Sequence, residues 1–125
     1  MKERQGRIRR VLVVDDEWPI SESLAMILSH SGFAAKTAQS GEQAIEIASV
    51  FLPDVLISDV VMRGISGIEA ANEILAFLPT CKVILLSGQA TMPDLSRRNR
   101  TAKTYEILSK PVSPDVLVQR IADLS

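Results

Sequence analysis

The chain alternates five times between a short apolar run and a segment with helical hydrophobic spacing, and this alternation limits the fold more than any other feature. Strands are predicted at residues 10–14, 33–37, 55–58, 82–86 and 105–109. Helices are predicted at residues 19–30, 40–52, 67–78, 93–102 and 114–124. Because strands that alternate with helices pair in parallel, the pattern predicts an α/β fold with helices on both faces of a parallel sheet.

Capping signals mark several helix ends. Pro19 suits a first helical turn, where its missing N–H is not needed. Ser40 with Gln43 forms a capping-box pattern, and Ser113 precedes the last helix as an N-cap. By spacing, the first helix is predicted to bury four side chains, those of Ile20, Leu24, Ile27 and Leu28.

Length and composition narrow the class of protein. The 125 residues predict a single domain over 1–125, and 46 % hydrophobic residues can fill a core. A net charge of −1 argues against a dedicated nucleic-acid binder, and no apolar run is long enough for a membrane span or a signal peptide. Cys81 is the only cysteine, which favours a buried strand residue in a reducing, cytoplasmic compartment. Residues 1–9 are predicted to be a flexible basic tail, with a docking arm as the alternative.

Residues that can carry chemistry stand at the ends of four predicted strands. Asp15 and Asp16 follow the first strand, Asp59 the third, Ser87 the fourth and Lys110 the fifth. In a parallel sheet these carboxyl ends share one edge, which is where open α/β sheets bind ligands. For Asp59 alone, an aspartate that only caps the next turn is the alternative explanation, but it does not account for the set.

The chemistry of this set points to a metal and to phosphorus. Three converging carboxylates repel one another, and carboxylates with waters and a backbone carbonyl are the ligands that Mg²⁺ takes, Mn²⁺ being an alternative. One carboxylate could then act as a nucleophile toward phosphorus. Lys110 could balance the charge of an incoming phosphoryl group, and Ser87 could donate a hydrogen bond to it.

Five motifs together resemble the receiver domain of two-component response regulators, of the chemotaxis-response-regulator type. They are Val13-Val-Asp-Asp-Glu17, Asp59-x-x-Met62, Gly67, Leu86-Ser-Gly88 and Lys110-Pro111. The resemblance extends from about Arg10 to the end of the chain. It implies a flavodoxin-like, doubly wound five-stranded sheet in the order 2-1-3-4-5 with five flanking helices.

The resemblance also implies roles for these residues. Asp59 would accept a phosphoryl group from a sensor histidine kinase or a phosphotransfer protein. Asp15, Asp16, Asp59 and the carbonyl of Val61 would hold Mg²⁺. Ser87 and Lys110 would contact the phosphoryl group, and the Lys110–Pro111 peptide bond would be cis. Such a domain catalyses only its own phosphorylation and dephosphorylation, and it acts on a downstream protein or a linked output domain, without contacting nucleic acid or membrane.

The chain departs from the family pattern at three places. Arg63 stands where receivers often have proline, which predicts a less rigid loop after the site. Residues 100–104 replace the usual small residues, which makes the fourth helix atypical. Ile107 occupies the position of an aromatic side chain that turns inward on activation, and Tyr105 lies on the same face of the strand. The face carrying Arg97, Arg98, Arg100 and Lys103 is either a solvated basic surface or the output surface.

Two alternatives to a phosphoacceptor remain open from the sequence. The first is a binding module of the same fold that is never phosphorylated, against which the complete set of site residues argues. The second is an aspartyl-nucleophile phosphatase, which typically has a second acid where this chain has Val61. A nucleotide-binding role is excluded by the lack of a glycine-rich phosphate loop after a strand.

Overall fold

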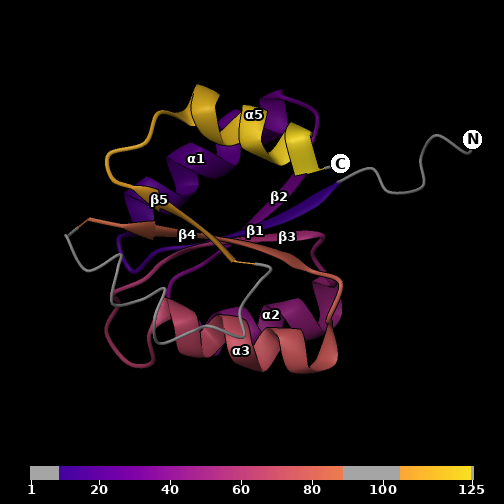
Figure 1. Ribbon diagram of the computed structural model, residues 1–125, viewed down its shortest axis with the longest axis vertical. Coiled ribbons are helices and arrows are strands. Elements are labelled where there is room, and N and C mark those ends of the chain that lie inside the picture. The colour runs from indigo at the N-terminus through magenta and orange to yellow at the C-terminus, as the bar shows by residue number, and fades with distance from the viewer. Residues whose placement is uncertain (1–8, 89–104, 125) are drawn as a thin grey trace, which may run out of the picture.

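A computed structural model describes residues 9–88 and 105–124 as a five-stranded sheet between two layers of helices (Figure 1). In chain order the elements are β1 (Arg10–Val14), α1 (Trp18–His30), β2 (Ala34–Ala38), α2 (Gly41–Phe51), β3 (Val55–Asp59), α3 (Gly67–Phe77), β4 (Lys82–Ser87), β5 (Tyr105–Ser109) and α5 (Pro114–Leu124). The predicted fourth helix, at 93–102, and most of the predicted basic tail lie outside the described residues. Of that tail, Arg9 is described, and its backbone N–H donates to Oδ2 of Asp54 at 2.9 Å.

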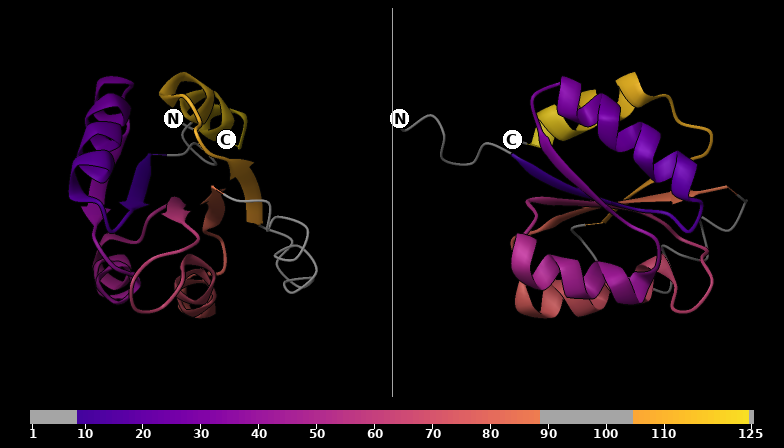
Figure 2. Two further views of the ribbon diagram at one scale, coloured as in Figure 1. Left: turned by 90° about the vertical axis from the view of Figure 1, so that its left-hand side faces the viewer. Right: turned by 180° about the vertical axis from the view of Figure 1, so that it is seen from behind.

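All strand pairs are parallel, and the strand order is β2-β1-β3-β4-β5. This confirms the predicted flavodoxin-like sheet. Helices α1 and α5 cover one face, and α2 and α3 cover the other, as Figure 2 shows from two sides. The register pairs Val14 with Ser58, Asp59 with Leu86, and Ser87 with Ser109, so the carboxyl ends of the strands meet at one edge.

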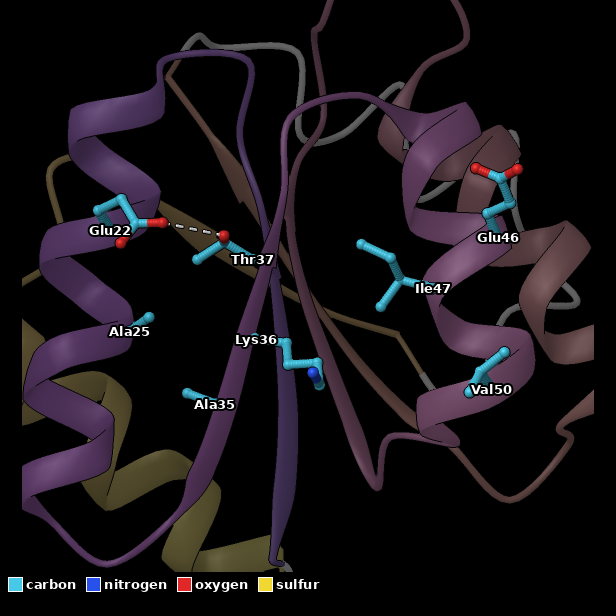
Figure 3. A pocket seen from close by; sticks show the side chains of 8 residues that line it. All are labelled: Glu22, Ala25, Ala35, Lys36, Thr37, Glu46, Ile47 and Val50. Carbon is cyan, nitrogen blue, oxygen red and sulfur yellow. Dashed lines mark hydrogen bonds between the residues drawn. The ribbon is translucent and has the colours of Figure 1, made fainter.

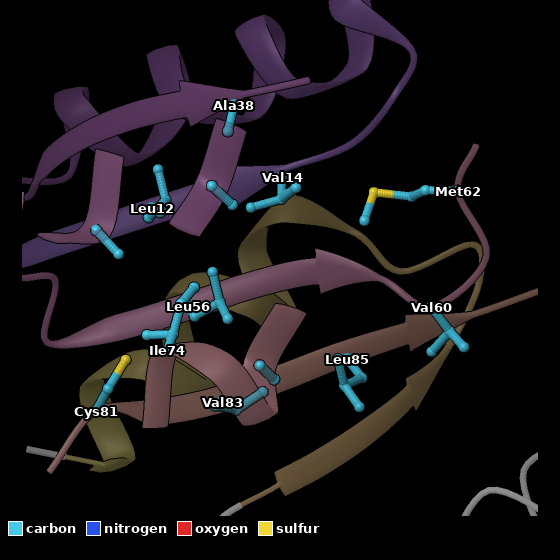
Figure 4. Close-up of a cluster of buried hydrophobic side chains, with 13 residues drawn as sticks. Leu12, Val14, Ala38, Leu56, Val60, Met62, Ile74, Cys81, Val83 and Leu85 are labelled. Atoms are coloured by element: carbon cyan, nitrogen blue, oxygen red, sulfur yellow. The ribbon is translucent and has the colours of Figure 1, made fainter. Parts of the chain in front are cut away.

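The core has two layers because alternate residues of a strand point to opposite faces of the sheet. Leu12, Val14, Leu56 and Leu85 pack toward α2 and α3, in the cluster drawn in Figure 4. The other layer, under α1 and α5, has ten buried members: Val11, Val13, Leu24, Leu28, Val55, Ile57, Ile84, Leu86, Leu117 and Ile121. Each fully buried aliphatic side chain contributes about 1.5–3 kcal/mol, so the sheet forms a stiff base for the residues at its edge.

Local capping explains where the helices begin. The hydroxyl of Ser40 accepts the N–H of Gln43 at 3.0 Å, and the side chain of Gln43 accepts from Gln39 rather than from Ser40. A complete capping box lies instead at α3, between Ser66 and Glu69. This box was not predicted, although its Ser-x-x-Glu pattern is present in the sequence.

The predicted capping box at Ser40 is thus only half formed, and two further predictions about local structure were wrong. The second strand runs one residue later than predicted, because Ala38, and not Phe33, continues the ladder with β1. Ile20 is 49 % exposed and is not part of the core. It lines an open hollow between α1 and α5, while Ser21 of the same turn is buried.

Within the described ranges, no helix has both the length and the apolar character needed to cross a bilayer.

Candidate functional site

Three carboxylates converge at the carboxyl edge of the sheet. Asp15 and Asp16 directly follow β1, and Asp59 is the last residue of β3; one oxygen from each lies within 4.8 Å of the others. Asp15 is buried, and Oδ1 of its carboxylate accepts the N–H of Glu17 at 2.9 Å. The structure therefore brings together the three acids that the sequence predicted to meet.

The pKa of Asp15 lies above its ordinary value of 3.8, chiefly because burial disfavours the charged carboxylate. The N–H of Glu17 and the charge of Lys110 oppose this rise, while the charges of Asp59 and Asp16 add to it. Burial first, and the neighbouring negative charges second, thus disfavour the ionised form of Asp15, and a bound cation would offset both effects. Three oxygen donors of this kind fit a hard divalent cation.

Lys110 brings a positive charge into the acid cluster. Its Nζ lies 2.9 Å from Oδ1 of Asp59. Burial by itself lowers the pKa of Lys110, but the hydrogen bond to Asp59 and the charges of Asp59, Asp15 and Glu17 outweigh it, so the pKa lies above its usual value. The side chain is therefore a permanent cation near neutral pH. The Lys110–Pro111 peptide bond is cis, as the resemblance implies.

Ser87 ends β4 between the other two strand ends. It is buried, and its carbonyl accepts the N–H of Lys110 at 2.8 Å, which fixes the start of the loop that carries the lysine. Gly88 follows, and a Cβ there would lie in ordinary contact, 3.6 Å, with Cδ of Lys110. The described part of the chain is interrupted after this residue.

The loop from Val60 to Ser66 closes the site on the β3 side. The N–H of Val60 donates to the carbonyl of Leu86 at 3.0 Å, and the N–H of Gly67 donates to that of Val60 at 2.8 Å. A Cβ on Gly67 would overlap the carbonyl oxygen of Asp59 and lie 2.9 Å from Oγ of Ser58. Only glycine permits this approach, so Gly67 allows the start of α3 to lie directly against the backbone of Asp59. Val61 lies in this loop and is 75 % exposed.

Arg63, which stands where receivers often have proline, contacts one acid of the site. Its N–H donates to Oδ2 of Asp16 at 3.2 Å, and its Nε lies 3.5 Å from the same oxygen. The N–H of Ile65, two residues on, lies 3.4 Å from Oε2 of Glu42 in the first turn of α2. These contacts tie the loop at two points, and neither contact is signalled by a pattern in the sequence.

The described surface contains several hollows, and two of them differ in their relation to the site. One, of about 530 Å³, adjoins the site: Asp15 and Lys110 line it together with apolar residues of α1 and α5, including Ile20, Leu24 and Leu117. The other, of about 660 Å³, lies along the edge of β2 between α1 and α2 (Figure 3). There Thr37 donates to Glu22 at 3.1 Å, and none of the predicted site residues lines the hollow.

The fold and site define a flavodoxin-like domain with an acidic, lysine-containing site at the carboxyl edge of its sheet. A family model of the response regulator receiver domain matches residues 11–122. The chain therefore belongs to the receiver domain family of two-component response regulators.

Individual relatives agree with this assignment. The chain is 32 % identical over 124 residues to the probable transcriptional regulatory protein TcrX of Mycobacterium tuberculosis, covering 99 % of this chain and 53 % of that protein. It superposes on the chemotaxis protein CheY4 of Vibrio cholerae with a TM-score of 0.86 at 24 % identity, covering 94 % and 99 % of the two chains, which shows the shared fold. It also matches the response regulator TrrA of Thermotoga maritima, whose structure is a complex with Mg²⁺-BeF, at a TM-score of 0.79 and 33 % identity, over 94 % and 100 %.

The chain spans only part of the curated relatives. It covers 53 % of the length of TcrX, and 25 % of the transcriptional regulatory protein GlrR of Escherichia coli. Both relatives are named as transcriptional regulatory proteins, and in both the matched region is only part of a longer protein.

Proposed function

We propose that this receiver domain accepts a phosphoryl group on Asp59 from a phosphohistidine of a sensor histidine kinase or phosphotransfer protein. An oxygen of Asp59 forms a bond to phosphorus, and the bond from phosphorus to the histidine nitrogen breaks, with its electron pair leaving on the imidazole. The observation that carries the proposal is the contact of 2.9 Å between Lys110 and Asp59 inside a cluster of three carboxylates. A nucleophile, a fixed cation and a set of hard oxygen ligands are thus present at one point.

Each neighbour of Asp59 has a distinct part in this reaction. Lys110 offsets negative charge on the oxygens of the incoming phosphoryl group, and its ammonium group already lies at the site. Ser87 supplies a hydroxyl at the adjacent strand end, from which a hydrogen bond to a phosphoryl oxygen is donated. Asp15, Asp16, Asp59 and the carbonyl of Val61 would hold Mg²⁺ or Mn²⁺, which would supply positive charge that offsets the negative charge of the phosphoryl group. Support for a metal comes from the carboxylate cluster and from the Mg²⁺-BeF complex of TrrA.

The hollow between α1 and α5 is the approach that we propose for the phosphohistidine-bearing partner. It is lined mainly by apolar side chains, and it reaches the site itself through Asp15 and Lys110. Ile20, which lines the hollow, is 49 % exposed, and Trp18, two residues earlier in α1, is 53 % exposed, so both large apolar side chains are accessible to a partner. A kinase that draws its phosphoryl group from ATP would place this reaction in the cytoplasm.

Loss of the phosphoryl group to water would return the domain to its starting state, so its own turnover is the only catalysis proposed. The output is a change of surface that starts at Ser87 and Gly88, where β4 ends. A phosphatase that acts on free substrates is disfavoured because Val61 offers no carboxylate two residues after Asp59.

Intact-protein mass spectrometry after incubation with acetyl phosphate and Mg²⁺ tests the proposal. The wild-type chain should gain one phosphoryl group, and Asp59→Asn should gain none. Asp54→Asn is the matched control, since Asp54 lies at the opposite edge of the sheet, where it accepts the N–H groups of Arg9 and Arg10. Equal labelling of the Asp59→Asn protein, or turnover of a generic phosphate ester without a protein adduct, would reject Asp59 as the phosphoacceptor.

A further inference from the structure

Arg63 differs from the family pattern in two physical properties that both act on Asp16. A proline at this position has no N–H and no charge, whereas Arg63 donates its backbone N–H to Oδ2 of Asp16 at 3.2 Å and places Nε 3.5 Å from the same oxygen. The residue that departs from the family pattern therefore places a positive charge beside one of the three acids of the site.

In this structure two cations pair with different acids of the cluster. Lys110 pairs with Asp59 from within the fold, its side chain being 33 % exposed. Arg63 pairs with Asp16 from outside, since its side chain is 84 % exposed and that of Asp16 is 20 % exposed. The two cations therefore differ in how easily they can leave: the side chain of Lys110 is largely covered by the fold, whereas that of Arg63 can return to solvent at little cost.

The backbone around Arg63 keeps it beside Asp16. Gly64, the next residue, has φ +81°, a conformation that other residues adopt only with strain. The carboxylate of Glu42 lies against this glycine and 3.4 Å from the N–H of Ile65. The loop is thus anchored on α2, so Arg63 stays near Asp16 although its side chain projects into water.

We propose that Arg63 is an internal counter-cation that weakens the binding of divalent metal, because the metal must displace the guanidinium group from Asp16. This inference rests on the proposed metal-dependent function and adds that Arg63 sets the metal concentration at which the site fills. The site would fill only at a higher Mg²⁺ concentration than in a receiver with proline at this position. Because Arg63 is exposed, added salt should screen its effect.

The proposal is tested without any phosphorylation by measuring Mn²⁺ binding. Bound Mn²⁺ is measured as the decrease in the EPR signal of the free ion. Arg63→Ala keeps the backbone N–H and removes the guanidinium group; Arg63→Gln removes the charge and keeps most of the length. Lys82→Ala is the control, since Lys82 is an exposed cation at the start of β4, on the opposite edge of the sheet. Mg²⁺ is then measured by competition with Mn²⁺.

Relative to Lys82→Ala, both Arg63 variants should bind Mn²⁺ about twofold to fivefold more tightly at low ionic strength, the range that exposed ion pairs reach. The gain should shrink in 0.5 M salt, at roughly a 4 Å Debye length. In EDTA the Arg63 variants should melt below the wild type, and saturating Mg²⁺ should remove that difference. Unchanged or weaker Mn²⁺ binding in the variants would overturn the role of Arg63. A wild-type chain that binds neither ion would instead reject the metal site of the proposed function, and this inference with it.

Discussion

Nζ of Lys110 lies 2.9 Å from Oδ1 of Asp59, and this pair joins two strands that are not neighbours in the sheet. Asp59 ends β3, Lys110 follows β5, and β4 with Ser87 at its end runs between them. The lysine therefore spans one strand to reach the acid. Its pKa is raised, so the charge that holds this contact persists throughout the neutral range.

Replacing Lys110 with alanine should slow phosphoryl uptake from acetyl phosphate by about a hundredfold, because a preorganised cation beside the attacking oxygen is lost. The initial rate of adduct formation by mass spectrometry gives the measurement. Arg120→Ala is the control, since Arg120 pairs with Glu106 on the surface. An uptake rate in Lys110→Ala equal to that of the control would mean that the pair with Asp59 is structural only.

The substitution Asp15→Asn should raise the melting temperature by a few degrees in metal-free buffer. It removes a buried charge, which the charges of Asp59 and Asp16 oppose, and it keeps the oxygen that accepts the N–H of Glu17. In saturating Mg²⁺ the advantage should vanish, because only the wild type would gain stability from the ion. Scanning calorimetry with EDTA and with Mg²⁺ measures both. A destabilised Asp15→Asn protein in EDTA would show that repulsion within the cluster is negligible.

Gly67→Ala should cost about 1–3 kcal/mol of unfolding free energy, because its Cβ would meet backbone and not a flexible side chain. Gly88→Ala is the matched control: a Cβ there would lie in ordinary contact with Cδ and Cβ of Lys110, at 3.6 and 4.0 Å, and its cost should stay within about 0.5 kcal/mol. Urea unfolding of the two variants gives both values. Equal stabilities would imply that α3 can withdraw from Asp59 without cost.

Burial raises the pKa of the Cys81 thiol to about 12, against 9.0 for an ordinary thiol. Between these values the unfolded chain loses a proton that the native state keeps, so Cys81 should lower stability as pH rises above 9, by about 1.4 kcal/mol per pH unit. Cys81→Ala lacks this effect, while Tyr105 and Lys110 titrate in both proteins. The stability gap between wild type and variant, from urea unfolding at pH 8 to 11, should therefore narrow with pH. A constant gap would show that the thiol ionises equally in both states.

Much of the fold could be predicted because its signals are local. Strands β1 and β5 both match their predicted ranges to the residue, because a largely apolar run that ends at polar residues is visible in the sequence alone. The capping residues Ser40 and Ser113 also act as predicted, each accepting an N–H three residues on. β2 slipped by one position because its alanines carry little hydrophobic contrast, and the ladder with β1 decides its register.

The sequence by itself determined which chemical groups this protein presents: acids, a hydroxyl and a lysine at the carboxyl ends of parallel strands must share an edge, whatever the details of packing. Only the tertiary structure decided how those groups pair. Arg63 reaches Asp16 across 47 residues of chain, and Glu42 supports the same loop from α2. Ile20 faces an open hollow and not the core. Such contacts join segments with no periodic relation to each other, so they follow from the way loops and helices dock on the sheet and leave no pattern in the sequence.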